Sequence, residues 1–242
     1  MANLALLNNV DHHDLRLSRK RGAANGETVN QVRVFPTEFR ALQREYPLFF
    51  RRADDGAFYT VAILGLDRDE NLFLEERDGS VEWTTRTLPA ILDRGPFSIG
   101  TGNTDDSQNH VIMVDLDHPW IGRDEGELLF RSHGGNAADL DRAAGTLRLL
   151  HQGVAIETAM FQAFHAADLL AYLDVTLRLD ESTEYKLPEL YTIRPDALRN
   201  LEGDALRALN ASGFLELATY VMASHDNLNR LTEIKNQRRG IL

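Results

Sequence analysis

The spacing of apolar residues changes at about residue 137, and this change constrains the fold more than any other feature. Before it, short apolar or alternating runs are separated by turn signals such as DDG, DRDE and RDGS, which is typical of antiparallel strands. After it, apolar residues recur at helical spacing. They are Leu140, Leu147, Leu150, Val154, Phe161, Phe164 and Leu169. The sequence therefore predicts an α+β fold, in which an antiparallel β-rich N-terminal half is packed with a mostly helical C-terminal half.

Local signals fill in this outline. FPTEFRALQREYP predicts one short helix, because Pro36 opens it and Pro47 stops it. The Asp-Gly pair in RDGS is the best hairpin signal. Residues 137–173 are predicted as one long helix, or as two helices with a break near Gly153, and YTIRP as a last short strand. The predicted organisation is an N-terminal arm and linker over 1–30, a β-rich half over 31–136 and a helical half over 137–242; the alternative is one continuous domain.

Composition excludes several classes of site. The 242 residues include no cysteine, which excludes disulfides, thiolate zinc sites, iron–sulfur clusters and cysteine nucleophiles. No run of 18 apolar residues occurs, and the N-terminus lacks the basic leader of a signal peptide, so we expect a cytoplasmic protein without a transmembrane segment. The formal net charge of −11 argues against general affinity for nucleic acid. No cofactor is predicted, and the oligomeric state stays open.

Histidine and aspartate near the N-terminus suggest one metal site. His12 and Asp14 form an H-x-D element like the one that begins a two-His-one-carboxylate iron site, and a distal histidine would complete it. The candidates for that third ligand are His110, His118 and His133. Such oxygenases hold this element between strands, however, and only eleven residues precede it here. The alternative is a surface or packing role.

An acidic cluster and two glycine loops could each form a binding site or have only a structural role. Asp115, Asp117 and His118 follow an apolar strand and would suit a divalent ion, but paired acids before a proline are typical of a solvated turn. The glycine loops at 100–102 and 134–136 offer free N–H groups to an anion, although neither has the spacing of a nucleotide-binding loop. The motifs G-x-S-x-G and H-E-x-x-H are absent.

Aromatic and arginine side chains gather around the predicted strands. Trp and Arg are enriched at binding hot spots, although Trp in a small α+β domain is more often part of the core. The residues concerned are Trp83, Arg86, Arg94, Phe97 and, further on, Trp120. From this set and its surroundings we predict a ligand-binding surface around Asn71, Trp83 and Arg94.

Read in order, ten segments of the chain resemble the bacterial SapC family. They are HHDLRL, FPTEF, YPLFF, LGLDRDENLFLEE, Trp83, LPAILDRGPFSIG, VDLD, GELLF, YTIRP and LNASGFLELATYVMASHDNLNRL. The resemblance runs from about His12 to Leu231, and the order and spacing of the motifs carry it. The chain departs from the pattern at Asp93, where we expect a second Arg beside Arg94.

The resemblance implies a binding or accessory role. The family is named for a component associated with a bacterial surface layer, and its members are similar to proteins found near non-haem oxygenases, flavin-dependent halogenase-like proteins and TonB-dependent transporters. It is distinct from the peptide-transporter permease of similar name, and it brings no catalytic residues to carry over. We therefore expect a non-catalytic binding or accessory protein with a protein or peptide partner. The alternative is a metal-dependent oxygenase or other modifying enzyme that uses His12, Asp14 and a distal histidine.

Overall fold

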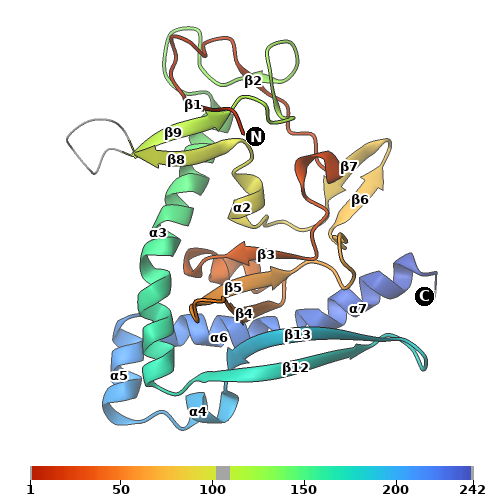
Figure 1. The fold of residues 1–242 in the computed structure, drawn as a ribbon, viewed down its shortest axis with the longest axis vertical. Helices are drawn as coiled ribbons and strands as arrows, with labels where there is room; N and C mark the ends of the chain where they lie inside the picture. The colour runs from red at the N-terminus through yellow and green to blue at the C-terminus, as the bar shows by residue number, and fades with distance from the viewer. Residues whose placement is uncertain (1, 102–109, 241–242) are drawn as a thin grey trace. The chain divides into compact units, whose positions relative to one another are not determined.

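The computed structural model describes residues 2–101 and 110–240, and the side chains of Thr101 and His110 are not described. The chain divides into two units. Unit 1 comprises Met1–Glu27, Leu74–Trp83 and Ala90–His151, and unit 2 comprises Thr28–Phe73, Thr84–Pro89 and Gln152–Leu242. The longest helix, α3 (Ala138–Ala166), contributes to both units (Figure 1).

Unit 1 is built from short strands and the first half of α3. One sheet has the order β1-β9-β8, a second has the order β10-β2-β11, and β6 and β7 form a hairpin, all antiparallel. The strands are β1 (Leu4–Leu6), β2 (Arg16–Leu17), β6 (Leu74–Arg77), β7 (Ser80–Trp83), β8 (Phe97–Thr101), β9 (His110–Asp115), β10 (Ile121–Gly122) and β11 (Glu127–Leu128). The short helices are η1 (Ala23–Asn25) and α2 (Ala90–Asp93).

The N-terminal residues of the chain belong to unit 1 because some of them are buried in its core. Leu15 and Leu17 are buried in one cluster with Trp120 from the turn after β9 and with Leu140 and Leu147 from α3. Strand β1 pairs with β9, with Leu4 opposite Asp115. The structure thus assigns residues 1–27 to unit 1, where the sequence predicted an arm and linker over 1–30.

Unit 2 is a five-stranded antiparallel sheet with helices. The strand order is β12-β13-β4-β5-β3, and α6 packs against β4 and β13 while α7 contacts β12 (Figure 1). The strands are β3 (Gln31–Val34), β4 (Leu48–Arg52), β5 (Phe58–Ile63), β12 (Leu170–Arg178) and β13 (Glu184–Ile193). The helices besides α3 are η2 (Pro36–Glu38), α1 (Phe39–Leu42), α4 (Pro195–Arg199), α5 (Gly203–Ala211), α6 (Phe214–Ser224) and α7 (Asn227–Arg238).

The predicted fold class is confirmed, since the sheets are antiparallel and lie mostly in the N-terminal half, while most helices lie in the C-terminal half. The hairpin at RDGS is also confirmed. Asp78 and Gly79 have φ of 51° and 76°, as a two-residue turn between β6 and β7 requires.

The structure differs from the prediction in the C-terminal half and in the grouping of the chain. Helix α3 runs unbroken through Gly153 and ends at Ala166, and the long β12–β13 hairpin follows where a helix to 173 and one short strand were predicted. The two units also interleave along the sequence instead of meeting at residue 137. In residues 2–101 and 110–240, no helix combines the length and the hydrophobicity needed to span a bilayer.

Candidate functional site

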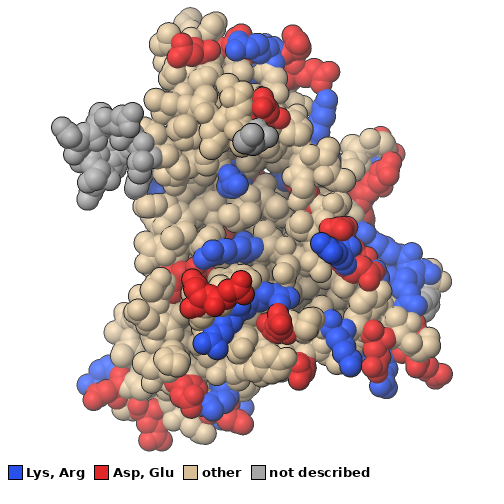
Figure 2. Space-filling view, viewed as in Figure 1, with Lys and Arg blue, Asp and Glu red and all other residues tan. Residues whose placement is uncertain are grey.

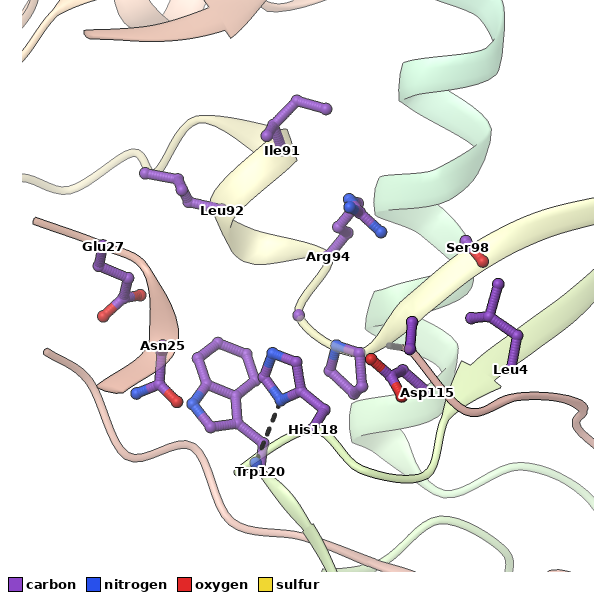
Figure 3. A pocket seen from close by; sticks show the side chains of 13 residues that line it. Leu4, Asn25, Glu27, Ile91, Leu92, Arg94, Ser98, Asp115, His118 and Trp120 are labelled. Carbon is purple, nitrogen blue, oxygen red and sulfur yellow. Dashed lines mark hydrogen bonds between the residues drawn. The ribbon is translucent and has the colours of Figure 1, made fainter. Parts of the chain in front are cut away.

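Unit 1 contains a cavity of about 450 Å³. Its walls come from β1, η1, α2 and the turn after it, the start of β8 and the segment that follows β9. Figure 3 shows Arg94, His118 and Trp120 around this space, with Asp115 beside His118 and the apolar Ile91 and Leu92 on α2. The cavity therefore combines an aromatic and aliphatic lining with a few charged groups, which is the usual make-up of a ligand site.

Trp120 forms a fixed part of the lining. Its side chain is only 1% exposed, and its Nε1–H donates a hydrogen bond of 2.6 Å to the carbonyl oxygen of Lys20. The guanidinium of Arg21 lies 5.1 Å from the centroid of the indole ring, within the range of a cation–π contact. A Cβ on Gly95 would lie 2.5 Å from the indole, and Gly95 has φ of +53°. Glycine at 95 thus lets the backbone approach the ring.

His118 is held by its neighbour in the same turn. Its Nδ1 accepts a hydrogen bond of 3.1 Å from the backbone N–H of Trp120 (Figure 3). Burial is the largest effect on the pKa of His118 and lowers it. The negative charge of Asp115 opposes this shift, the positive charge of Arg94 adds to it, and the negative charge of Glu27 also opposes it. A neutral imidazole that accepts at Nδ1 carries its proton on Nε2. His118 is therefore a hydrogen-bond donor at Nε2.

Asp115 and Asp117 bind the N-terminal segment. Asp115 Oδ1 accepts hydrogen bonds from the backbone N–H of Asn3 at 2.8 Å and of Asp117 at 3.2 Å, and Asp117 Oδ1 accepts one from the side chain of Asn3 at 3.3 Å. Within the described ranges, no group of three or more His, Asp or Glu side chains is arranged to hold a metal ion. These contacts give the two aspartates a structural role beside the cavity.

Arg94 and two residues from the segment before β3 complete the polar lining. Arg94 Nη1 donates to the carbonyl oxygen of Phe97 at 2.8 Å. Glu27 is 2% exposed and accepts from Arg21 at 2.5 Å and from the backbone N–H of Gly22 at 2.7 Å. The side-chain oxygen of Asn25 is buried without a hydrogen-bond partner in the part of the chain that the structure describes.

Comparison with protein-family models matches residues 7–231 of this chain to SapC. The chain belongs to the SapC family. Neither the curated proteins nor the solved structures include a significant match. The SapC match spans segments of both units. The five-stranded sheet and the cavity lining lie within the matched region, except for Ala2 and Leu4.

Only one of the three residues predicted to bind a ligand lines the cavity of this SapC-family chain. Arg94 does so. Trp83 lies in β7 of unit 1, half-buried and opposite Leu74. Asn71 belongs to unit 2, is 4% exposed, and its side-chain oxygen accepts from the backbone N–H of Phe73 at 3.0 Å. The ligand-binding role of Asn71, Trp83 and Arg94 stays a prediction.

Two of the predicted metal ligands, His12 and Asp14, have protein partners. His12 is 8% exposed, and its Nδ1 accepts from the backbone N–H of Asn8 at 3.2 Å. Asp14 forms an ion pair with Arg123, and this hydrogen bond lowers the pKa of Asp14. His110 opens β9, but its side chain is outside the described structure. Of the other distal candidates, His118 lines the cavity and His133 is exposed.

The structure also places the two glycine loops and Asp93, the position where the SapC pattern has a second arginine beside Arg94. The N–H of Gly134 donates within its own turn, to the carbonyl oxygen of Arg131, and Gly102 of the other loop lies outside the described residues. Asp93, the departure from the SapC pattern, pairs with Arg19 at 3.1 Å and accepts from Thr146 at 3.2 Å. Asp93 thus has a structural partner on α3.

Sequence reasoning missed Asn25 and Glu27 as parts of the cavity. Both lie in SRKRGAANGETVN, a polar segment that is typical of a linker. Their place depends on Arg21 and on the carbonyl oxygen of Lys20, which binds both Asn25 and Trp120. The contact between Lys20 and Trp120 joins residues 100 positions apart, and no local signal reports it.

Proposed function

We propose that this SapC-family protein is a non-catalytic binding or accessory protein, and that the cavity of unit 1 takes a small polar ligand or the end of a peptide or partner protein. The observation that carries the proposal is the set of hydrogen-bonding groups on the cavity wall. Arg94, His118 with its Nε2–H, and Asn25 line it together with Trp120.

The protonation of His118 supports binding over catalysis. Ser98, His118 and Asp115 all line the cavity, and these are the residue types of a nucleophilic triad. In such a triad the histidine donates from Nδ1 to the carboxylate and accepts the serine proton at Nε2. Here Nδ1 accepts from the backbone of Trp120, so Nε2 carries a proton and is a donor.

The donors on the wall favour a ligand with a carboxylate. Arg94 provides the positive charge, and the His118 Nε2–H provides a second donor. Charge-assisted hydrogen bonds of this kind are the strong ones. The apolar walls around them favour a ligand with an uncharged body, as the C-terminal end of a peptide would have.

Tryptophan fluorescence provides a direct test. The chain has two Trp residues, so Trp83→Phe leaves Trp120 as the reporter of this cavity. We expect acetylated dipeptides with a free C-terminal carboxylate to change its emission, and the same peptides as amides to bind at least about tenfold more weakly, the loss expected for one charge-assisted contact.

A matched pair of variants locates the binding. Arg94→Met, made in the Trp83→Phe background, removes the cavity's cation, whereas Arg86→Met removes an exposed one outside it. The first variant should abolish the preference for the carboxylate, and the second should leave it unchanged. Equal binding of acid and amide by the parent protein would contradict the proposal.

The accessory role needs a partner from the host. The resemblance motivates three classes of partner, namely oxygenases, halogenase-like enzymes and outer-membrane transport systems. The proposed location of the protein is the cytoplasm. Lys and Arg are interspersed with Asp and Glu on the face drawn in Figure 2, which favours a protein or peptide partner over nucleic acid. Affinity capture from the native host with mass spectrometry, run in parallel with Arg94→Met, tests this, and cell fractionation tests the location. A partner recovered equally by both proteins would count against the cavity as its binding site.

A further inference from the structure

Unit 2 contains a second cavity, of about 470 Å³. It lies among β3, the β4–β5 turn and the C-terminal part of α3, and every residue that lines it belongs to unit 2. In Figure 2, blue and red side chains gather over β3 and the β4–β5 turn of Figure 1. This second cavity is lined by Arg33, Arg52, Phe58, Glu157 and Phe161, among others.

Glu157 is the unusual group in this cavity. It is 6% exposed, and its Oε2 accepts a hydrogen bond of 2.6 Å from Arg33 Nη2. Its other oxygen, Oε1, is buried and has no hydrogen-bond partner among residues 2–101 and 110–240. A buried carboxylate with only one oxygen paired is costly, so a cation that pairs with the Glu157 carboxylate would relieve that cost.

Positive charge and aromatic rings surround the carboxylate. The guanidinium of Arg33 lies 5.1 Å from the ring of Phe35 and 5.6 Å from that of Tyr59. Arg52 is exposed, and its guanidinium lies 5.8 Å from the ring of Phe58. The rings of Phe58 and Phe161 lie 5.8 Å apart and offer an apolar surface.

We propose that this second cavity binds a zwitterion of the α-amino acid type with an apolar side chain. The ligand ammonium pairs with the Glu157 carboxylate, its carboxylate pairs with Arg52, and its side chain lies on Phe58 and Phe161. The mixed charge of the lining fits a zwitterion better than a simple anion or cation, because each sign on the protein then meets its opposite. The site is independent of the cavity proposed above in unit 1.

The probes are L-phenylalanine and two analogues that each lack one charged group, 3-phenylpropionate without the amine and phenethylamine without the carboxylate. Calorimetric titration of the full chain should give L-phenylalanine an affinity at least about tenfold above either analogue, the difference expected for one charge-assisted contact. Equal affinities, or no binding of L-phenylalanine at millimolar concentration, would overturn the proposal.

Variants then separate a ligand contact from a structural effect. In Glu157→Gln the preference for L-phenylalanine over 3-phenylpropionate should fall to near one, whereas general damage to the site would weaken both probes equally and keep the ratio. In Arg52→Met, whose exposed position keeps folding intact, the preference over phenethylamine should fall in the same way. An unchanged ratio in either variant contradicts the contact assigned to that residue.

Two exposed controls complete the design. Glu181→Gln and Arg68→Met change the same residue types outside this cavity and should leave all affinities unchanged. Arg94→Met, in the cavity of unit 1, should also leave L-phenylalanine binding unchanged. The Trp120 emission reports unit 1 and the calorimetric ratio reports unit 2, so failure of one proposal is distinguishable from failure of the other.

Discussion

The imidazole of His225 stacks on the ring of Phe49, with centroids 4.6 Å apart and 12° between the ring planes. Its Nε2 also lies 3.1 Å from the hydroxyl of Thr192. Burial lowers the pKa of His225, against smaller opposing effects of the Leu48 backbone and the Asp226 charge. The folded state therefore favours the neutral imidazole.

This arrangement predicts a loss of stability in mild acid. An unfolded histidine has a pKa of about 6.5, and the folded value is lower, so the stabilisation is complete above that pH and is lost as the pH falls towards the folded pKa. His225→Phe should keep the stacking and reduce the difference in unfolding free energy measured by urea at pH values of about 7.5 and 5.5. The exposed His133→Gln is the control, and an equal pH dependence in both variants would refute the assignment.

Lys235 on α7 holds a loop of unit 2. Its Nζ lies 2.5 Å from both Asp67 Oδ2 and Glu70 Oε1, and Lys235 itself is 8% exposed. Lys235→Met should keep the packing of the stem but leave two carboxylates without their cation, at a cost of about 2 kcal/mol, since Asp67 is half exposed. Urea unfolding measures this, and the exposed Lys186→Met should change stability by less than about 0.5 kcal/mol. A similar effect of both substitutions would exclude the proposed role of the ion pairs.

Two glycines in α3 should respond in opposite directions to the same substitution. A Cβ on Gly153 would lie 2.4 Å from Phe35 Cβ and 2.7 Å from Thr37 Oγ1, whereas one on Gly145 meets no atom within 4 Å. Gly145→Ala should stabilise the protein by about 0.5–1 kcal/mol through helix propensity. Gly153→Ala should destabilise it by about 1–3 kcal/mol through overpacking. Thermal unfolding of both variants checks this, and stabilisation by Gly153→Ala would show that the close approach is absent.

Gly153 also shows the limit of sequence reasoning about this fold. An isolated glycine in a helical pattern predicts a weak point or a break, yet here it lets α3 approach Phe35 and the helix continues. The actual end of α3 has no glycine. Asp168 adopts φ of 54°, and the N–H of Leu169 binds the carbonyl oxygen of Phe164. Because aspartate rarely takes this conformation, the sequence placed the helix end several residues too late.

The missed hairpin and the missed cavity residues have similar causes. Pro188 interrupts the alternating pattern of β13, and Glu189, with φ of 58°, lies at an irregularity in the β12–β13 register. The alternating sequence pattern is therefore interrupted at the same place as the pairing of the two strands. By contrast, Asp78-Gly79 encodes its turn locally and was predicted correctly. Arg94, which lines the cavity, was chosen from its residue type alone, and its role in binding stays a prediction. The segment with Asn25 and Glu27 contacts Trp120 through the carbonyl oxygen of Lys20, and periodicity does not report this long-range contact.

The environment of His12 predicts weak metal binding. Its Nδ1 accepts a hydrogen bond from Asn8, so the neutral ring has its proton on Nε2. Coordination through Nε2 would move that proton to Nδ1 and break the bond to Asn8, and Asp14 would have to leave Arg123. We therefore expect less than one equivalent of iron, manganese or zinc per chain after controlled loading and desalting, measured by plasma mass spectrometry.

Substitution of the adjacent histidines makes this test specific. His12→Ala should destabilise the protein by about 1 kcal/mol, because it leaves the Asn8 N–H without its acceptor, and should not change the metal content. His13 is exposed, and its Nδ1 lies 3.0 Å from the carbonyl oxygen of Val10, so His13→Ala should have a smaller effect on stability. Stoichiometric metal that His12→Ala abolishes and His13→Ala retains would instead support the metal-dependent enzyme predicted as the alternative, with His12 and Asp14 as its first ligands.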